Sequence, residues 1–579
     1  MLTHRHPHLA HLEQSGLIRV AQVEPEIEYL FHHALVQDAA YDSLLRQDRR
    51  RLHLAVGEAL EALYSDQPGE MAPLLAYHFA LAGDKQRAVR YFSLAGELAV
   101  AAYANKEAEG HYRAALELVE SDEERAGLLT RLGWAIRNQD SIESAIHLWQ
   151  EAIDLRRALG QDEEVATLYS IVALAAWHMG DTPLGLQLSL EGLALLDDKP
   201  ESPAMASLLH QTARAYFFNG LPEDAGELCV RALAVAERAN RIWLQVDILT
   251  TMGILPHYGF HQAVAFFSRA AELAMRHMDS PAAPTRALYN LGELWLRAGE
   301  FDKAYDCFIQ GRHGIEQVRG VFGEVWGSSL LGVLALLKGE LDQVETMLPA
   351  LFERTRTIED PGPVIFALQV IEAMLLLYRG QWEEALLSLQ LCQAETREQG
   401  DLQFLSAACY SLAETLLELG RWEEAASTIA ETIALADEGL GWIWGRVAAR
   451  RIAVVAHLAL GQVPEARQRL TEMRAVATYP ALPAEQADLA VSEARLALAE
   501  GRWLEARAAF QTAHDLHSQM GKRWYEARVL YELAEAHLQR AIADDKTVAR
   551  ELLNQAETLF EQVGAPCYAQ KVAEMKSLV

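Results

Sequence analysis

Apolar residues recur at every third or fourth position along most of the chain, in stretches separated by single glycines. Before Gly420, the apolar positions are Leu405, Ala408, Leu412, Leu416 and Leu419. After Gly420, they are Trp422, Ala425, Ile429, Ile433 and Ala436. Spacings of three and four place such residues on one face of a helix. The pattern therefore predicts two amphipathic helices that meet at Gly420.

This helix, glycine, helix unit repeats along the chain at intervals of 39 to 41 residues. The glycines are Gly180, Gly220, Gly259, Gly299, Gly339, Gly380, Gly420, Gly461 and Gly501. Most are followed five residues later by a small or branched residue: Ala225, Ala304, Val344, Ala385, Ala425, Ala466 and Ala506. Glycine fits the left-handed residue that ends the first helix, and the small residue lets the second helix approach closely. We predict an all-α solenoid of about a dozen helical hairpins, each buried only against its neighbours.

A bulky apolar residue usually stands two positions after the glycine. The bulky residues are Phe301, Leu341, Trp382, Trp422 and Trp503. We expect these side chains to fill the space beside each turn, and therefore to be buried.

The repeat resembles the tetratricopeptide repeat, most closely in YNLGELWLRAGEFDKAYDCF, from Tyr289 to Phe308. That family has a period of about 34 residues, whereas this chain has about 40, which implies longer helices. The longer period is similar to that of the superhelical domain of large bacterial signalling ATPases and the maltose-regulon activator. The resemblance implies a right-handed superhelix over residues 65–579, with a concave face available to protein partners.

Residues 1–64 do not follow the repeat. The stretch from Leu9 to Val20 predicts a helix and then a strand, and Glu26 to Leu45 predicts a strand and then a helix. This order resembles the latter part of a winged helix. The element FHHALVQDAAY, from Phe31 to Tyr41, together with Arg51 and His53, resembles the segment that follows the nucleotide-binding domain in signal-transducing, often cyclase-associated, ATPases.

No phosphate-binding loop is present, because Gly521-Lys522, the one Gly-Lys pair, is followed by Arg523 and lacks the upstream glycine. By this resemblance the chain corresponds to the C-terminal part of such an ATPase. An ATPase or cyclase domain is then expected upstream of Met1.

Charge and cysteine content favour a cytoplasmic protein that binds neither nucleic acid nor membrane. The chain has 51 basic and 81 acidic residues, a net charge of −30, which repels nucleic acid and anionic lipid. Its five cysteines have neither disulfide-framework nor zinc-site spacing. No uninterrupted apolar run approaches the roughly 20 residues of a membrane span.

Two clusters near the start, one of histidines and one of arginines, are candidate binding sites. Metal binding by the histidines is less favoured than a chain terminus with a helix cap, because no spaced pair with a carboxylate accompanies them. A nucleic-acid contact by the arginines is less favoured than a solvated face or a contact with an ATPase domain. The histidines are His4, His6, His8 and His11, and the arginines are Arg46, Arg49, Arg50 and Arg51.

The recurring carboxylate pairs, such as Glu423-Glu424, fit a preference for acidic residues at helix N-termini. No arrangement of nucleophile, base and acid is visible. We therefore predict no catalysis, no cofactor and no metal.

In the tetratricopeptide family the first helix of each hairpin lines the groove, about 13, 10, 9 and 6 residues before the turn glycine. Here these positions give His210, Gln211, Arg214, Arg286, Tyr289, Asn290, Glu293, Trp326, Ser329, Tyr410, Ser411, Glu414, Arg451, Ser492 and Arg495. We expect the aromatic and arginine side chains of this set to project into the groove and contact a protein or peptide.

Three functional hypotheses remain open. The first is a non-catalytic protein- or ligand-sensing scaffold of a bacterial signalling ATPase or cyclase-type regulator. The second is a stand-alone peptide-binding adaptor, and the third is a DNA-binding regulator that uses residues 1–64.

Overall fold

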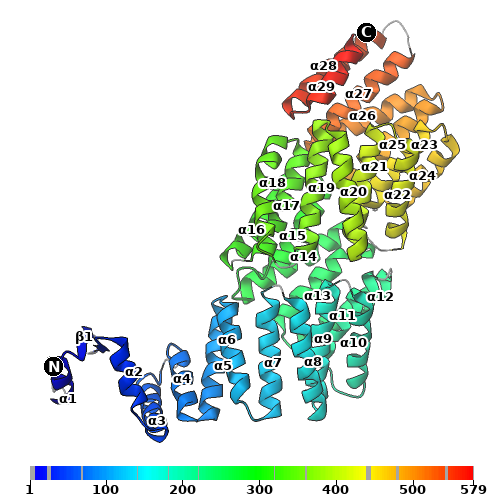
Figure 1. The fold of residues 1–579 in the computed structure, drawn as a ribbon. Coiled ribbons are helices and arrows are strands. Elements are labelled where there is room, and N and C mark those ends of the chain that lie inside the picture. The colour runs from blue at the N-terminus through cyan, green and yellow to red at the C-terminus, as the bar shows by residue number, and fades with distance from the viewer. Residues whose placement is uncertain are drawn as a thin grey trace. The chain divides into compact units, whose positions relative to one another are not determined.

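The computed structural model shows an all-α solenoid, as the apolar periodicity predicts (Figure 1). It describes residues 7–22, 28–66, 69–139, 141–179, 181–218, 221–318, 320–358, 361–438, 445–477, 481–540 and 545–577. Of the positions named above, Met1, His4, His6, Glu26, Gly180 and Gly220 lie outside the described residues. The chain divides into two compact units, Met1–Leu159 and Gly160–Val579.

The first unit begins with a short strand pair and continues as helical hairpins. Its elements are α1 (Pro7–Gln14), β1 (Ile18–Gln22), β2 (Glu28–Phe31), α2 (Ala34–Asp42), α3 (Arg46–Leu63), α4 (Ala72–Ala82), α5 (Lys85–Ala101), α6 (Asn105–Leu118), α7 (Asp122–Arg137) and α8 (Ile142–Ala158). β1 and β2 are antiparallel, with Ile18 opposite Phe31 and a register shift between Val20 and Gln22. The order helix, strand, strand, helix agrees with the expected one, and the resemblance to a winged helix stays a prediction.

The second unit is a continuous series of hairpins. Its elements are α9 (Asp162–His178), α10 (Thr182–Leu195), α11 (Pro203–Phe218), α12 (Pro222–Arg238), α13 (Ile242–Ile254), η1 (Pro256–Tyr258), α14 (Gly259–His277), α15 (Thr285–Arg297), α16 (Phe301–Gln317), α17 (Val321–Lys338), α18 (Leu341–Thr355), α19 (Gly362–Arg379), α20 (Trp382–Gln399), α21 (Leu402–Glu418), α22 (Trp422–Asp437), α23 (Arg446–Ala459), α24 (Val463–Val476), α25 (Pro483–Ala499), α26 (Trp503–Met520), α27 (Arg523–Arg540), α28 (Asp545–Gln562) and α29 (Pro566–Lys576).

The turn glycines have the conformation that the sequence predicts. Gly299, Gly339, Gly380, Gly420, Gly461 and Gly501 all have φ between 72° and 83°. The alanines five residues later, such as Ala304 and Ala425, are fully buried between the two helices of each hairpin. Gly259 is different, because α13 stops at Ile254 and Gly259 begins α14 instead. Pro256 explains the early stop, since proline cannot continue a helix.

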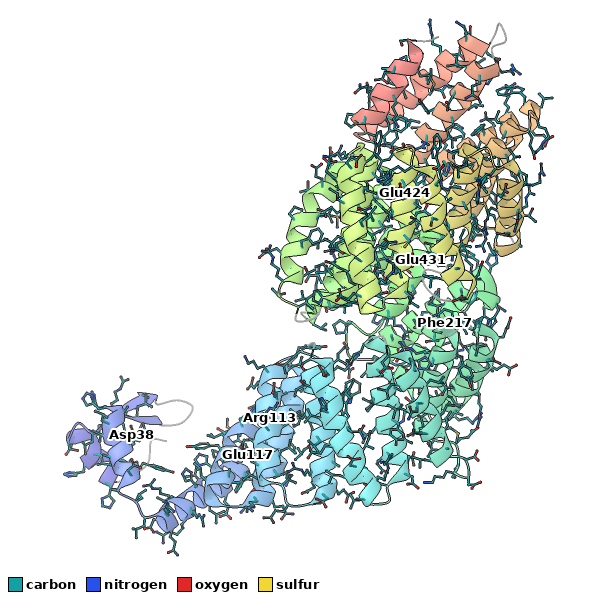
Figure 2. All side chains as sticks on the ribbon, turned by 45° about the vertical axis from the view of Figure 1, so that its right-hand side comes forward. Asp38, Arg113, Glu117, Phe217, Glu424 and Glu431 are labelled. Carbon is teal, nitrogen blue, oxygen red and sulfur yellow. The ribbon has the colours of Figure 1, made fainter. Side chains whose placement is uncertain are left out.

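Two carboxylates of α22 that are labelled in Figure 2, Glu424 of a recurring pair and Glu431, form ion pairs with arginines. Glu424 accepts two hydrogen bonds from Arg421, at 2.7 and 2.6 Å, within the first turn of the helix. Glu431, two turns further on, accepts 2.9 Å bonds from Arg397 of α20. These carboxylates stabilise helix ends and neighbouring hairpins, in keeping with the structural role expected for them.

The C-terminal hairpins pack back onto hairpins from the middle of the second unit. One hydrophobic core is formed jointly by α17–α19 and α27–α29. At its centre Tyr378 stacks on Trp524 with ring centroids 4.5 Å apart, and its hydroxyl lies 2.8 Å from that of Tyr525. Further along, Arg297 of α15 pairs with Glu485 of α25 at 3.2 Å. The superhelix is therefore closed, with successive turns in direct contact.

Closure explains why the bulky residues after the turn glycines differ in exposure. Phe301 and Leu341 are buried as expected, and Trp382 is covered by Tyr568 and by the Lys571 ammonium 4.2 Å from its ring. The expectation is wrong for Trp422, which is 40% exposed. Among the described residues, nothing lies within 4 Å of a Cβ placed on the neighbouring Gly420.

Two helices of this closed region are long and apolar enough to cross a membrane, by length and composition alone. They are α17 and α19, and 50% and 56% of their apolar windows are buried inside the solenoid. Both contribute to the core shared with α27–α29, which accounts for their apolar composition.

A pair of glycine substitutions tests closure. Gly380→Ala and Gly420→Ala both force alanine into a left-handed conformation, which costs about 1–2 kcal/mol. A Cβ at Gly380 would also collide with Cys567 of α29, whereas one at Gly420 meets nothing within 4 Å. We therefore expect Gly380→Ala to lose about 1–3 kcal/mol more, from overpacking. Urea denaturation of the full chain measures the difference, and equal losses would contradict the contact with α29.

Candidate functional site

The structure sorts the predicted groove residues into two groups within the second unit. The first group lies on α11, α15 and α17, and comprises His210, Gln211, Arg214, Arg286, Tyr289, Asn290, Glu293, Trp326 and Ser329. The second lies on α21, α23 and α25, and comprises Tyr410, Ser411, Glu414, Arg451, Ser492 and Arg495. Their surroundings differ because the superhelix is closed over the second group.

Arg451 is the hub of the second group. Its guanidinium pairs with Glu414 of α21, with Asp488 of α25 at 3.1 Å, and donates to the Tyr410 hydroxyl at 3.0 Å. The side chains of Arg451 and Glu414 are only 12% and 13% exposed. Three successive first helices are therefore joined through one buried cation.

A second set of ion pairs continues this network towards the C-terminus. Arg495 of α25 binds Glu532 of α27, and Arg528 binds both Glu532, at 3.2 Å, and Glu418 of α21. Lys571 of α29 also reaches Glu418, at 3.4 Å. Members of both sets line one small cavity, and we call the two sets together the polar centre. Its members are Tyr410, Glu414, Glu418, Arg451, Asp488, Arg495, Arg528, Glu532 and Lys571.

The polar centre is a balanced set of charges. Burial alone would raise the pKa of Glu418, but Arg528 and Lys571 outweigh it and hold that pKa below its usual value. The same holds for Glu532, where burial is outweighed by Arg495 and Arg528. Opposite charges this close favour the ionised form of both partners. The cavity that remains among them has a volume of only about 50 Å³, too small for a peptide.

The expectation of an open groove is therefore wrong at the second group. Tyr410, expected to project outward, is 8% exposed, and Ser411 is 2% exposed. The physical reason is that α27 and α29 reach back to α21, where Arg528 and Lys571 bind Glu418, so this surface meets other helices instead of solvent. Tyr410, Glu414, Arg451 and Arg495 of this group belong to a polar core instead.

The inner face remains accessible where it is formed by α11, α13 and α15. Thr251 of α13 joins the three helices, with its hydroxyl 2.8 Å from His210 Nε2 and accepting from Arg286 at 3.2 Å. Arg286 also pairs with Asp247 at 3.1 Å, and these two side chains are 40% and 35% exposed. Trp243, which is 50% exposed, lies one helical turn before Asp247 on the same side of α13. We call this surface the α11–α15 face: Trp243, Asp247 and Arg286 form its accessible part, and the buried His210 and Thr251 lie beneath them.

Several predicted residues support this face from beneath. His210 is fully buried, and burial, aided by the charges of Arg214 and Arg286, lowers its pKa well below the usual value, so it is neutral. Gln211 and Arg214 are 7% and 5% exposed. The Asn290 amide donates to the carbonyl of Arg286 at 3.0 Å, and is thus engaged within its own helix.

Trp243, Asp247 and Thr251 were missed in the sequence because α13 ends early. Counting back from Gly259 gives Val246 and Leu249, which are buried. Pro256 could have predicted this, because a proline ends α13 before Gly259. The residues of α13 that face inward can then not be found by counting back from Gly259.

Tyr289, Trp326 and Ser329 connect neighbouring helices or their own backbone. The Tyr289 hydroxyl donates to the Gly323 carbonyl at 3.0 Å, so the expectation that this side chain projects freely is wrong. Trp326 stacks parallel to Phe322 with centroids 6.3 Å apart. Ser329 is 3% exposed and donates to its own helix at the Trp326 carbonyl. Tyr289, the residue of α15 that lies ten positions before Gly299, therefore faces the next hairpin.

Glu293 is the carboxyl residue of the first group, and its pKa is shifted strongly. Burial raises its pKa to about 7, and the nearby Arg297 lowers that pKa only in part. Arg297 is itself bound to Glu485 of α25. Glu293 therefore lies beside a contact between turns, with its counterion already engaged.

In the first unit, residues from the resembling segment have structural contacts. His53 of α3 lies 2.9 Å from the Tyr41 hydroxyl and 2.9 Å from His78 Nδ1, and so links α2 to α4. Arg49 donates to the Leu44 and Asp42 carbonyls, at 3.1 and 2.9 Å, at the end of α2. Among the residues that the structure describes, no group of three or more His, Cys, Asp or Glu side chains could hold a metal ion.

No protein-family model and no curated protein matches the chain. Among solved structures, a Rap protein complexed with competence and sporulation factor is 15% identical, with a TM-score of 0.48 over 61% of this chain and 98% of that one. A signal-transduction ATPase with a tetratricopeptide-repeat sensor, from Pyrococcus horikoshii, is 14% identical, with a TM-score of 0.41 over 73% and 61%. The Cut9–Hcn1 hetero-tetramer of APC/C is 12% identical, with a TM-score of 0.40 over 84% and 96%. The fold assignment rests on the helices of the chain itself.

The Glu293 carboxyl makes stability depend on pH. Its folded pKa of about 7 exceeds the unfolded value near 4.5, so the folded state binds the proton more tightly. The contribution of Glu293 to the free energy of unfolding is therefore greatest below pH 4.5 and decreases as the pH rises to about 7. We expect Glu293→Gln to be more stable than wild type at pH 8, by on the order of 1–3 kcal/mol, and equal to it at pH 4.5. Urea denaturation at both pH values is the measurement, and a gain that is the same at both would contradict the raised pKa.

Proposed function

We propose that the chain is a non-catalytic protein-binding scaffold, the sensing arm of a bacterial signalling ATPase or cyclase-type regulator. The observation that carries this proposal is the α11–α15 face. It presents a half-exposed tryptophan beside a partly exposed arginine–aspartate pair, on helices fixed by their neighbours. A solenoid holds such a surface preformed, so a partner binds with little ordering cost.

The chemistry of this face favours a protein or peptide partner. Tryptophan and arginine are enriched among the residues that supply most interface energy. Trp243 offers an apolar ring, while Asp247 and Arg286 neutralise each other and keep hydrogen-bonding capacity towards solvent. A peptide that brings an apolar side chain and main-chain amide groups satisfies both parts of the face.

The start of the chain supports a second contact, with an ATPase or cyclase domain. α2 has no buried residue, and Leu35 and Leu45 are 81% and 73% exposed. Leu30 and Phe31 of β2 are 50% and 42% exposed. Clustered apolar exposure of this kind marks interaction surfaces.

The two other hypotheses fit less well. A stand-alone adaptor would leave the apolar surface of β2 and α2 without a partner. A DNA-binding role would need free arginines, but Arg49 is held by the end of α2 and by the Tyr41 ring, 4.6 Å from its guanidinium carbon. The net charge of −30 also repels nucleic acid.

Site-specific photo-crosslinking tests the proposal. A benzophenone amino acid placed at Trp243 should give discrete adducts in extracts of the source organism, while one at Leu504 on α26, which is 79% exposed, should not. For the purified partner, we expect Trp243→Ala and Arg286→Ala each to weaken binding at least tenfold, roughly 1.4 kcal/mol. Both variants should stay folded, because Trp243 is half exposed and the Arg286–Asp247 pair is open to solvent, where such pairs contribute little to stability.

Two outcomes count against the proposal. One is an adduct pattern that is the same at positions 243 and 504, since that would indicate contact without specificity. The other is a purified partner whose affinity is unchanged by both substitutions.

A further inference from the structure

A cleft opens on the side of α11 away from the α11–α15 face. It has a volume of about 480 Å³ and is bordered by α10, α11 and α12. This volume is within the range of about 300–1,000 Å³ that is typical of small-molecule sites. Two other cavities of the second unit measure about 70 and 50 Å³. The cleft is therefore large enough for an organic ligand, whereas those two are not.

The lining on the helices is mainly apolar. The apolar side chains are Leu190 and Leu193 of α10, Met205 and Leu209 of α11, and Leu228 of α12. Methionine and leucine side chains adapt to irregular hydrocarbon shapes. Tyr216, near the end of α11, adds an aromatic ring to the wall.

Carboxylates dominate the charged part of the lining. Asp197, Asp224 and Glu227 line the cleft together with one cation, Arg231. Within the described part of the chain, none of these four residues forms an ion pair. The Arg231 guanidinium donates to the Met205 sulfur, at 4.0 Å.

Nearby arginines behave differently. Arg238 of α12 pairs with Glu201, and Arg269 of α14 pairs with Glu237 at 2.6 Å. Ion pairs between successive hairpins are thus common on this surface, and the cleft is a place where carboxylates are left without a counterion. Three negative charges against one positive charge give the cleft a net negative potential.

We propose that this cleft binds an organic cation with an apolar body. The hydrocarbon part would lie on the leucine and methionine side chains, and the ammonium or guanidinium group would pair with Asp224 and Glu227, one turn apart on α12. The Tyr216 ring adds a cation–π contact to the same group. An organic anion is disfavoured by the excess of carboxylates.

The test uses defined probes and the full chain. Isothermal titration with 4-phenylbutylamine should show saturable binding, and the neutral 4-phenylbutanol should bind at least tenfold more weakly. Putrescine, which carries charge but no apolar body, should also bind at least tenfold more weakly.

Substitutions then locate the site. Asp224→Asn with Glu227→Gln should weaken binding of the amine at least tenfold. Glu383→Gln with Glu384→Gln, which removes the same charge from exposed positions on α20, should leave it unchanged. Leu190→Trp should block the cleft, and it should be tolerated because Leu190 is 45% exposed. Circular dichroism checks that each variant is folded.

Three results would overturn the proposal. The first is the absence of saturable binding by the amine, and the second is equal binding of the amine and the alcohol. The third is amine binding that is insensitive to both Leu190→Trp and the α12 double substitution, which would place the cation elsewhere on this acidic chain.

Discussion

The packing of α27–α29 against α17–α19 is the contact on which the rest of the second unit depends. Tyr378 and Tyr525, 147 residues apart in sequence, share a hydrogen bond inside one hydrophobic core. In an open solenoid each hairpin is stabilised only by its neighbours. Here the middle and the end of the array also stabilise each other, so stability becomes a property of the closed turn.

Closure decides where the inner face can act. At the polar centre the inner faces of α21, α23, α25 and α27 meet, and their charges are satisfied by one another. Removing one member of such a network leaves an unpaired buried charge, which is costly. The α11–α15 face and the cleft on the opposite side of α11 are the two places where we propose that binding occurs.

The sequence predicts the hairpins well because each depends on local rules. Glycine in a left-handed turn and alanine at the close approach need no knowledge of distant residues, and both are found at Gly420 and Ala425. Closure could not be predicted, because small rotations between hairpins accumulate over a whole superhelical turn. The turns that contain Trp382 and Trp422 have almost the same sequence, GQWEEA and GRWEEA. Only the turn of Trp382 lies beneath α29. The exposure of groove residues such as Tyr289 and Tyr410 was also wrongly predicted, since both are buried.

Hydrogen exchange of a core variant tests closure most directly. Trp524→Ala removes the ring that stacks on Tyr378, whereas Phe510→Ala removes a ring from a separate core formed with α25 and α27. The closed superhelix predicts that Trp524→Ala speeds amide exchange in α17–α19 as well as in α27–α29, and that Phe510→Ala leaves α17–α19 largely protected. Unchanged exchange in α17–α19 after Trp524→Ala would contradict the account, since an open solenoid loses protection only near the substitution.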